Sequence, residues 1–152
     1  MVDKEYLKKH LRKHEELETA IIRYNALLNK DDISSPAGKT GLSIGGTLVS
    51  AVENAVCKKI IMEEKIERLE EDLARQRTII NSIFEKLENP YEKIVMQMRY
   101  EDRLEWDEIR GEIFGNRRDY SENIEKYNDR VFRIHGAALK HMKELQRIPE
   151  NK

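Results

Sequence analysis

The sequence has few residues that break helices, almost no cysteine and no long apolar segment. Its 152 residues include one cysteine, three prolines and seven glycines. The single Cys57 excludes an internal disulfide and supplies no set of zinc ligands, which favours a reducing compartment. No apolar run approaches the ~18 residues of a membrane span, and the first residues are too charged for a signal peptide. These absences predict a soluble, intracellular protein without a membrane partner.

The chain also lacks an excess of charge of either sign. It has 28 Lys and Arg against 29 Asp and Glu, a net charge of −1, so nucleic-acid binding must rest on local charge. Charge itself is abundant, at 38% of residues against about 25% in an average chain. A charged, proline-poor chain rich in helix formers favours helices with large solvated faces. We therefore expect an all-α fold.

The first expected helix covers residues 3–29, with Asp3 as its N-cap. His10 and His14 are one turn apart, but no third ligand is near them, so we interpret both as solvated and predict no metal site. Apolar residues recur at intervals that place them on one helical face, namely Leu7, Leu11, Leu17, Ile21, Tyr24 and Leu28.

Residues 30–46 hold Pro36, four of the seven glycines and several Ser, Asp and Thr, which predicts a flexible linker. Residues 47–88 then predict a helix of ~60 Å at 1.5 Å per residue. Its heptad repeat and charged flanks indicate a coiled coil. The heptad positions are Leu48, Val52, Ala55, Lys59, Met62, Ile66, Leu69, Leu73, Gln76, Ile80, Ile83 and Leu87.

The partner of this heptad seam is the first helix or a second copy of the chain. Extra apolar residues widen the face, so we expect both an antiparallel hairpin and a homodimer. Residues 1–88 are thus predicted to be a helical hairpin or coiled-coil oligomerisation region. The predicted oligomerisation residues are Ile66, Leu69, Leu73, Ile80, Ile83 and Leu87.

Residues 89–147 predict a second region, followed by a tail at residues 148–152. Asn89 caps a helix with Pro90 at its first position, and Glu92 completes a capping box. A helix over residues 104–114, a turn beginning Gly115-Asn116 and a long helix over about residues 120–147 form a helix-turn-helix. Asp119 with Glu122 is predicted to cap the long helix. The predicted core of the motif is Trp106, Ile109, Ile113, Val131 and Ile134.

Local charge supports DNA binding by this region. Residues 115–147 carry eight cations and five anions, a net +3, whereas residues 63–88 carry five and eight, a net −3. Phosphates attract the first segment, and the start of the second helix of the motif faces base edges, where Arg can read guanine and Asn adenine. The alternative is a charged helix that is merely solvated. The candidate DNA-binding residues are Arg117, Arg118, Ser121, Asn123, Lys126, Arg130, Arg133 and Lys140.

The segments MRYEDRLEWDEI and VFRIHGAALKHM, preceded by EKIERLEEDLARQRTIINSIFEKLENP, carry a resemblance over about two thirds of the chain. They resemble phage-encoded late-gene activators of the RinA and ArpU type, whose C-terminal unit is similar to sigma-factor region 4. The resemblance implies binding to phage promoter DNA in the bacterial host cytoplasm, and contact with RNA polymerase. It places Arg130, Arg133 and His135 in the recognition helix, and Trp106 with Ile109 in the supporting helix.

This sequence departs from that family at NRRDYSENIEKYN, which is inserted before the RIHG stretch. The insertion leaves open which arginines reach bases. It either lengthens the front of the recognition helix or adds a loop. His135 either contacts phosphate or caps a buried carbonyl.

Nothing in the sequence indicates catalysis. It has no His, Cys and Asp cluster with metal spacing, no nucleophile elbow and no isolated acid pair, so we predict no enzyme, no cofactor, and no catalytic or metal-binding residue. The predicted function is a homodimeric transcriptional regulator that binds double-stranded DNA, with RNA polymerase or another regulatory protein as a further partner. The alternatives are a helical protein-interaction module or anti-regulator, and a DNA-packaging protein similar to small terminase subunits.

Overall fold

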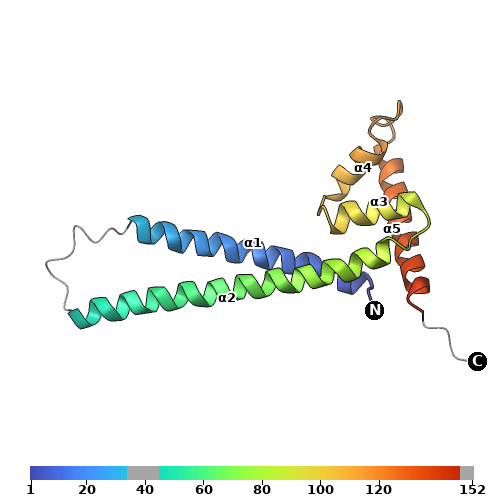
Figure 1. Ribbon diagram of the computed structural model, residues 1–152. Helices are drawn as coiled ribbons and strands as arrows, with labels where there is room; N and C mark the ends of the chain where they lie inside the picture. The colour runs from blue at the N-terminus through green and yellow to red at the C-terminus, as the bar shows by residue number, and fades with distance from the viewer. Residues whose placement is uncertain (34–44, 148–152) are drawn as a thin grey trace, which may run out of the picture. The chain divides into compact units, whose positions relative to one another are not determined.

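The computed structural model describes residues 1–33 and 45–147, which form five helices and no strand (Figure 1). The all-α prediction is confirmed for this part of the chain. None of its helices is both long and apolar enough to span a membrane. The helices are α1 (Lys4–Ile33), α2 (Gly45–Phe84), α3 (Pro90–Tyr100), α4 (Trp106–Phe114) and α5 (Ile124–Leu145).

The predicted linker over residues 30–46 is helical at both ends. Helix α1 continues to Ile33 and α2 begins at Gly45, so the linker prediction is wrong at these positions. Residues 34–44 of the linker and the predicted tail, residues 148–152, lie outside the described residues.

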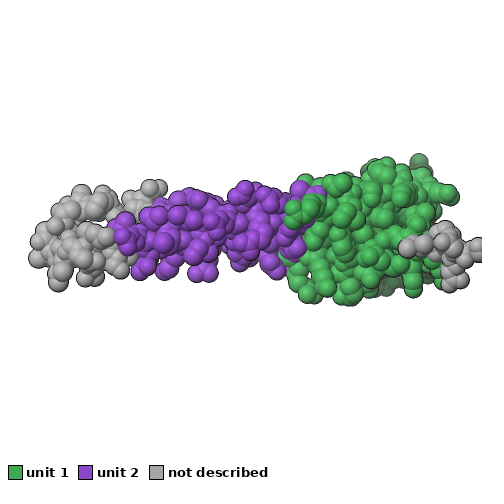
Figure 2. All heavy atoms as spheres, turned by 60° about the horizontal axis from the view of Figure 1, so that its bottom comes forward, with its two compact units in different colours: residues 1–12, 75–152 green, residues 13–74 purple. Residues whose placement is uncertain are grey.

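The chain divides into two compact units, coloured separately in Figure 2. Unit 1 consists of Met1–Arg12 and Arg75–Lys152, and unit 2 is Lys13–Ala74. Helices α1 and α2 each contribute to both units. The predicted division between residues 88 and 89 falls inside unit 1, because the start of α1 and the end of α2 pack with the C-terminal helices.

Within unit 2, α1 and α2 pair in opposite directions. Lys13 Nζ lies 3.7 Å from Asp72 Oδ2, and further along α1 the Tyr24 hydroxyl donates to Glu63 Oε1. Partners that come later in α1 come earlier in α2, so the helices are antiparallel, as the sequence predicted. Among the described side chains of unit 2, the buried ones are His14, Ala20, Leu69 and Leu73.

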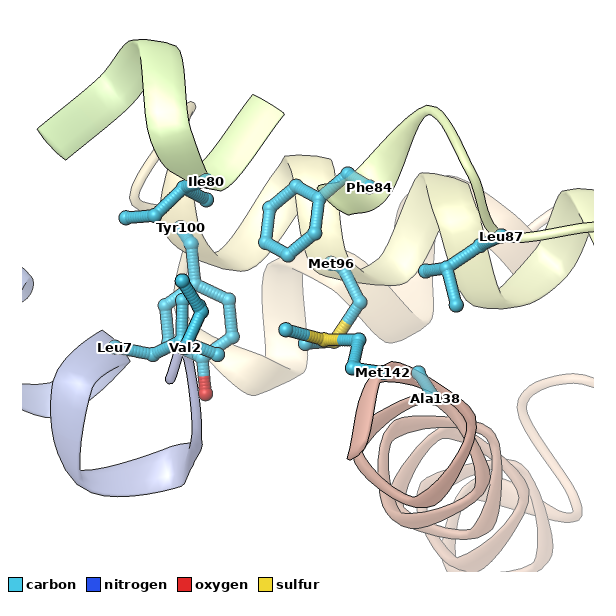
Figure 3. Close-up of a cluster of buried hydrophobic side chains, with 9 residues drawn as sticks. All are labelled: Val2, Leu7, Ile80, Phe84, Leu87, Met96, Tyr100, Ala138 and Met142. Carbon is cyan, nitrogen blue, oxygen red and sulfur yellow. The ribbon is translucent and has the colours of Figure 1, made fainter. Parts of the chain in front are cut away.

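Unit 1 contains a hydrophobic cluster to which α1, α2, α3 and α5 all contribute, here called the hairpin-base cluster. Figure 3 shows its side chains pointing toward one another from these helices. Phe84 at the end of α2 is fully buried in it. The cluster therefore fixes the position of α3 and α5 against the start of the hairpin. Its members are Val2, Leu7, Ile80, Phe84, Leu87, Met96, Tyr100, Ala138 and Met142.

The residues predicted to form the oligomer pack against other residues of the same chain. Four of the six are buried and the other two are partly buried, because the heptad seam faces the chain's own helices. The heptad seam is thus occupied within one chain, and its pairing with a second copy stays a prediction. The four buried residues are Leu69, Leu73, Ile80 and Leu87, and the partly buried ones are Ile66 and Ile83.

The two histidines of α1 are not solvated, and the sequence interpretation of them is wrong. His10 is 2% exposed and His14 is 7% exposed. The Nδ1 atom of His10 forms a 2.8 Å hydrogen bond with Oε1 of Gln76 on α2. Among the described residues, no group of three or more His, Cys, Asp or Glu could hold a metal ion. Histidine here contributes a polar contact within the hairpin.

Hydrogen bonds hold the first residues of the chain and the end of α5. The backbone N–H of Tyr6 donates to Asp3 Oδ1 at 2.9 Å, which confirms Asp3 as the cap of α1. The backbone N–H of Val2 donates to Gln146 Oε1 at 2.6 Å, and Gln146 Nε2 donates to the Val2 carbonyl at 2.8 Å. Residue 2 is thereby attached to the residue that caps the end of α5.

Candidate nucleic-acid interface

Helix α3 begins at the predicted cap, but only one half of the capping box is present: the Asn89 side chain accepts from the backbone N–H of Glu92 at 3.4 Å. The Asn89 side chain accepts from the backbone N–H of Tyr91 at 2.9 Å, and Pro90 is in the first turn. Glu92 is only 3% exposed, and its Oε1 lies 2.6 Å from Nδ1 of His141 on α5. The Glu92 carboxylate therefore ties α3 to α5 instead of returning to the cap.

The residues that carry the family resemblance contact one another. The Tyr100 hydroxyl oxygen lies 2.8 Å from Nε2 of His135 in a buried hydrogen bond. The Trp106 ring meets the His135 ring edge to face, with 4.8 Å between centroids. The Arg99 guanidinium lies 4.8 Å from the centre of the Trp106 ring. We call these four residues the Tyr100–His135 cluster, and through it the ends of α3 and α4 set the orientation of α5.

His135 is too buried to contact a phosphate. It is 8% exposed, and burial lowers its pKa from 6.5 to about 4, with a smaller effect from the charges of Lys4 and Arg99. Burial also raises the pKa of Tyr100 to about 12. The pair is therefore uncharged at neutral pH. Of the two roles expected for His135, phosphate contact is excluded, and its hydrogen-bond partner is a hydroxyl, not a carbonyl.

The inner face of α5 packs on α3 and α4 in a second hydrophobic cluster. Ile109 and Val131, two residues of the predicted motif core, are almost completely buried there. The Phe114 and Tyr127 rings stack within it, with 4.9 Å between centroids. The remaining predicted core residues are partly buried and pack against the same cluster, namely Trp106, Ile113 and Ile134.

Residues 115–123 connect α4 to α5, a longer turn than the three or four residues usual in a helix-turn-helix. Asp119 does not cap α5 with Glu122, and α5 begins at Ile124, not near residue 120. The Asp119 carboxylate instead accepts from the Tyr127 hydroxyl and from Asn123 Nδ2. The Tyr127 hydrogen bond lowers the pKa of Asp119, so this carboxylate stays charged. The inserted residues thus form a loop over residues 116–123, and their last five residues are the first residues of α5.

Arg110 of α4 holds the loop from the other side. Its Nε donates to the Tyr120 hydroxyl at 2.9 Å, and its Nη1 donates to Asn128 Oδ1 at 2.9 Å. Gly115 begins the loop in a right-handed conformation, not in the left-handed conformation typical of glycine turns. A Cβ there would collide with the Gly111 carbonyl oxygen, so the requirement for glycine is steric.

The eight candidate DNA-binding residues lie on α5 or on the loop before it. Asn123 is the one that is half-buried, and its amide N–H groups already donate to Asp119. The exposed loop residues are Arg117, Arg118 and Ser121, and the exposed α5 residues are Lys126, Arg130, Arg133 and Lys140.

None of these six cations forms an ion pair with a carboxylate of the described residues. Two of them contact rings: the Arg130 guanidinium lies 5.1 Å from the Phe114 ring centre, and Lys126 Nζ lies 5.9 Å from that of Tyr127. Arg133 has no such contact. Lys126, Arg133 and Lys140 follow one another at seven-residue intervals, which places them on one face of α5.

Arg147 follows Lys140 after a further seven residues. In the sequence analysis its charge was counted, but it was not included among the candidate DNA-binding residues. Lys143 is a second exposed cation near this end of α5. Phe132, next to Arg133, is 45% exposed. It was not included among the candidate site residues in the sequence analysis, because it is an apolar residue next to the buried face. Its ring meets that of Trp106 edge to face, 5.2 Å between centroids.

Comparison with protein-family models, with curated proteins and with solved structures finds no match to this chain.

Proposed function

We propose that this chain is a transcriptional regulator that binds double-stranded DNA through the outer face of α5 and the loop before it. The observation that carries the proposal is the group of exposed cations there without carboxylate partners. Such side chains can neutralise phosphates without first breaking an ion pair, so the counterions released from DNA supply the free energy of binding.

Contacts with α3 and α4 also hold α5 in a fixed orientation, as a recognition helix requires. Its inner face packs in the second hydrophobic cluster, and the Tyr100–His135 cluster fixes its orientation. Its N-terminal end carries the positive end of the helix dipole, which favours phosphate. In the proposed complex, Arg130 enters the major groove, Arg133 contacts a phosphate at the edge of the groove, and Arg117 and Arg118 contact a flanking strand. Asn123, held by Asp119, has a structural role in the loop.

The proposal is tested by charge removal at two places in the candidate site. Arg133→Gln should weaken binding to a random duplex about tenfold at 0.1 M salt, the amount expected for one lost phosphate contact. Arg117→Gln with Arg118→Gln should weaken it further. Arg133 is preferred to Arg130 because the latter also stacks on Phe114.

The matched control removes two cations from exposed positions of α2, Lys58→Gln with Lys65→Gln. Its affinity for duplex, measured by fluorescence anisotropy, should equal that of the unmodified protein. Equal affinities for the control and both site variants would refute the assignment of DNA binding to α5.

Self-association is a second function that one observation favours. Val56 and Ile60, together with Val52 of the heptad seam, lie on one flank of α2, and each is about half exposed. A helix that is apolar on more sides than its partner covers is usually buried in an assembly. We propose that a second copy covers this flank.

Sedimentation velocity tests this assignment with the variant Val56→Glu. The unmodified chain should sediment as a dimer and the variant as a monomer with unchanged helix content. A monomer in both cases rejects the interface. A ring of many copies would instead favour the DNA-packaging alternative.

A further inference from the structure

We propose that α5 carries a second DNA contact beyond its first turns, where a sugar–phosphate strand crosses the helix at Gly136. The contact consists of Arg133, Gly136, Lys140, Lys143 and Arg147, here called the Gly136 patch. This inference rests on the proposed DNA binding and adds Gly136, Lys143 and Arg147, which that proposal does not use.

Gly136 lies in the interior of the 22-residue helix α5, where glycine is unfavourable compared with alanine. Nothing in the structure lies within 4 Å of the position a Cβ would occupy, and the residue is exposed. Gly115, by contrast, is required by its own backbone, and a Cβ on Gly111 would meet the Tyr120 hydroxyl at 3.7 Å. The missing side chain of Gly136 therefore serves no contact within the described chain, but it lets another backbone approach closely.

A basic hollow begins one helical turn beyond Gly136, at Lys140. Its volume is about 300 Å³. Three cations and one carboxylate line it, which makes it net positive, and Lys143 and Arg147 have no carboxylate partner among the described residues. A net positive hollow with unpaired cations suits a phosphate group. The lining residues are Met1, Lys140, Lys143, Glu144 and Arg147.

The dimensions of DNA place a strand at this point. Gly136 lies twelve residues beyond the first residue of α5, a distance of about 18 Å along the helix axis. The major groove is about 12 Å wide, so a helix that enters it by its N-terminal end extends beyond the groove at this distance and passes over a flanking strand. Arg133 precedes Gly136 by three residues and Lys140 follows it by four, so both lie beside it on the same face. They can hold phosphates on either side of the crossing.

The variant Gly136→Ala distinguishes the close approach of a DNA strand to α5 from the stability of the helix. Alanine should raise the midpoint of thermal unfolding by about 3 °C, because it favours the helix and meets no neighbour. Duplex affinity should nevertheless fall about fivefold or more, since the methyl group keeps the strand away. Gly111→Ala is the matched control, with a similar gain in stability and no change in affinity.

A second measurement tests the charges of the patch. The double variant Lys143→Gln with Arg147→Gln should reduce the slope of log K against log salt by about 2, one for each phosphate contact. The α2 pair Lys58→Gln with Lys65→Gln should leave the slope unchanged. Both residues of the test variant lie outside the site that the proposed function uses.

The outcomes distinguish this inference from the proposed function. If the unmodified protein has no affinity for duplex, the proposed function fails and the inference fails with it. If the protein binds and Arg117→Gln with Arg118→Gln weakens it, but Gly136→Ala stays within twofold and the salt slope of the Lys143 and Arg147 double variant is unchanged, only the Gly136 patch is rejected.

Discussion

The buried His135 makes the stability of unit 1 depend on pH. Its pKa is about 4 in the folded protein and 6.5 in the unfolded chain, because burial disfavours the charged ring. Between these values the unfolded chain binds a proton that the folded protein does not. The stability contributed by the neutral ring is therefore complete above pH 6.5, and it is lost as the pH falls toward 4.

The size of this loss follows from the two pKa values. At about pH 5, the unfolded chain is almost fully protonated at this residue and the folded protein is not, which corresponds to about 2 kcal/mol of lost stability relative to pH 7.5. For a protein with a total stability of about 5–15 kcal/mol, this loss is easily measured.

Urea unfolding followed by circular dichroism at the two pH values tests the reasoning. His135→Gln should remove about 2 kcal/mol of the difference between them, whatever its own stability at neutral pH. Tyr100→Phe is the informative control, because it deletes the hydroxyl but leaves His135 buried, the main cause of the shift. It should keep most of the pH dependence. The reasoning is refuted if His135→Gln and the unmodified protein lose the same stability on acidification.

Three further predictions concern the fold and are checked by the same unfolding measurement at neutral pH. Phe84→Ala should cost about 3–5 kcal/mol, because the ring fills the centre of the hairpin-base cluster; a loss under about 1 kcal/mol would contradict this packing. Asn89→Ala should cost about 1 kcal/mol through the lost cap of α3, and an unchanged midpoint would count against the cap. Gly115→Ala should cost about 1–3 kcal/mol because its methyl group collides with the Gly111 carbonyl, whereas a stabilised variant would show that the loop can relax.

Helix periodicity was enough to predict the long elements. The spacing of apolar residues predicted two long helices, and the caps Asp3 and Asn89 were recognisable because a short polar side chain precedes each helix. The same periodicity did not show which surface the heptad seam covers. An apolar side chain such as Leu73 fits a hairpin and a dimer equally well, and the structure places it inside the chain.

Polar residues with long-range partners were the main source of error. His10 is buried because Gln76 supplies a hydrogen bond, and Glu92 is buried because His141 does, although these partners are distant in sequence. Asp119 fits the pattern of a capping box, but the Tyr127 hydroxyl competes for its carboxylate. The exposure of the candidate cations was easier to predict from the helical periodicity. Arg133, for example, lies opposite the buried face of α5.

The salt dependence of duplex binding by the unmodified full chain tests the central claim most directly. The experiment is a fluorescence-anisotropy titration of a random duplex at several salt concentrations between about 50 and 200 mM. With three to six of the candidate cations reaching phosphates, log K should fall linearly with log salt, with a slope between about −3 and −5. No detectable affinity at the lowest salt, or an affinity that salt does not change, would contradict the account.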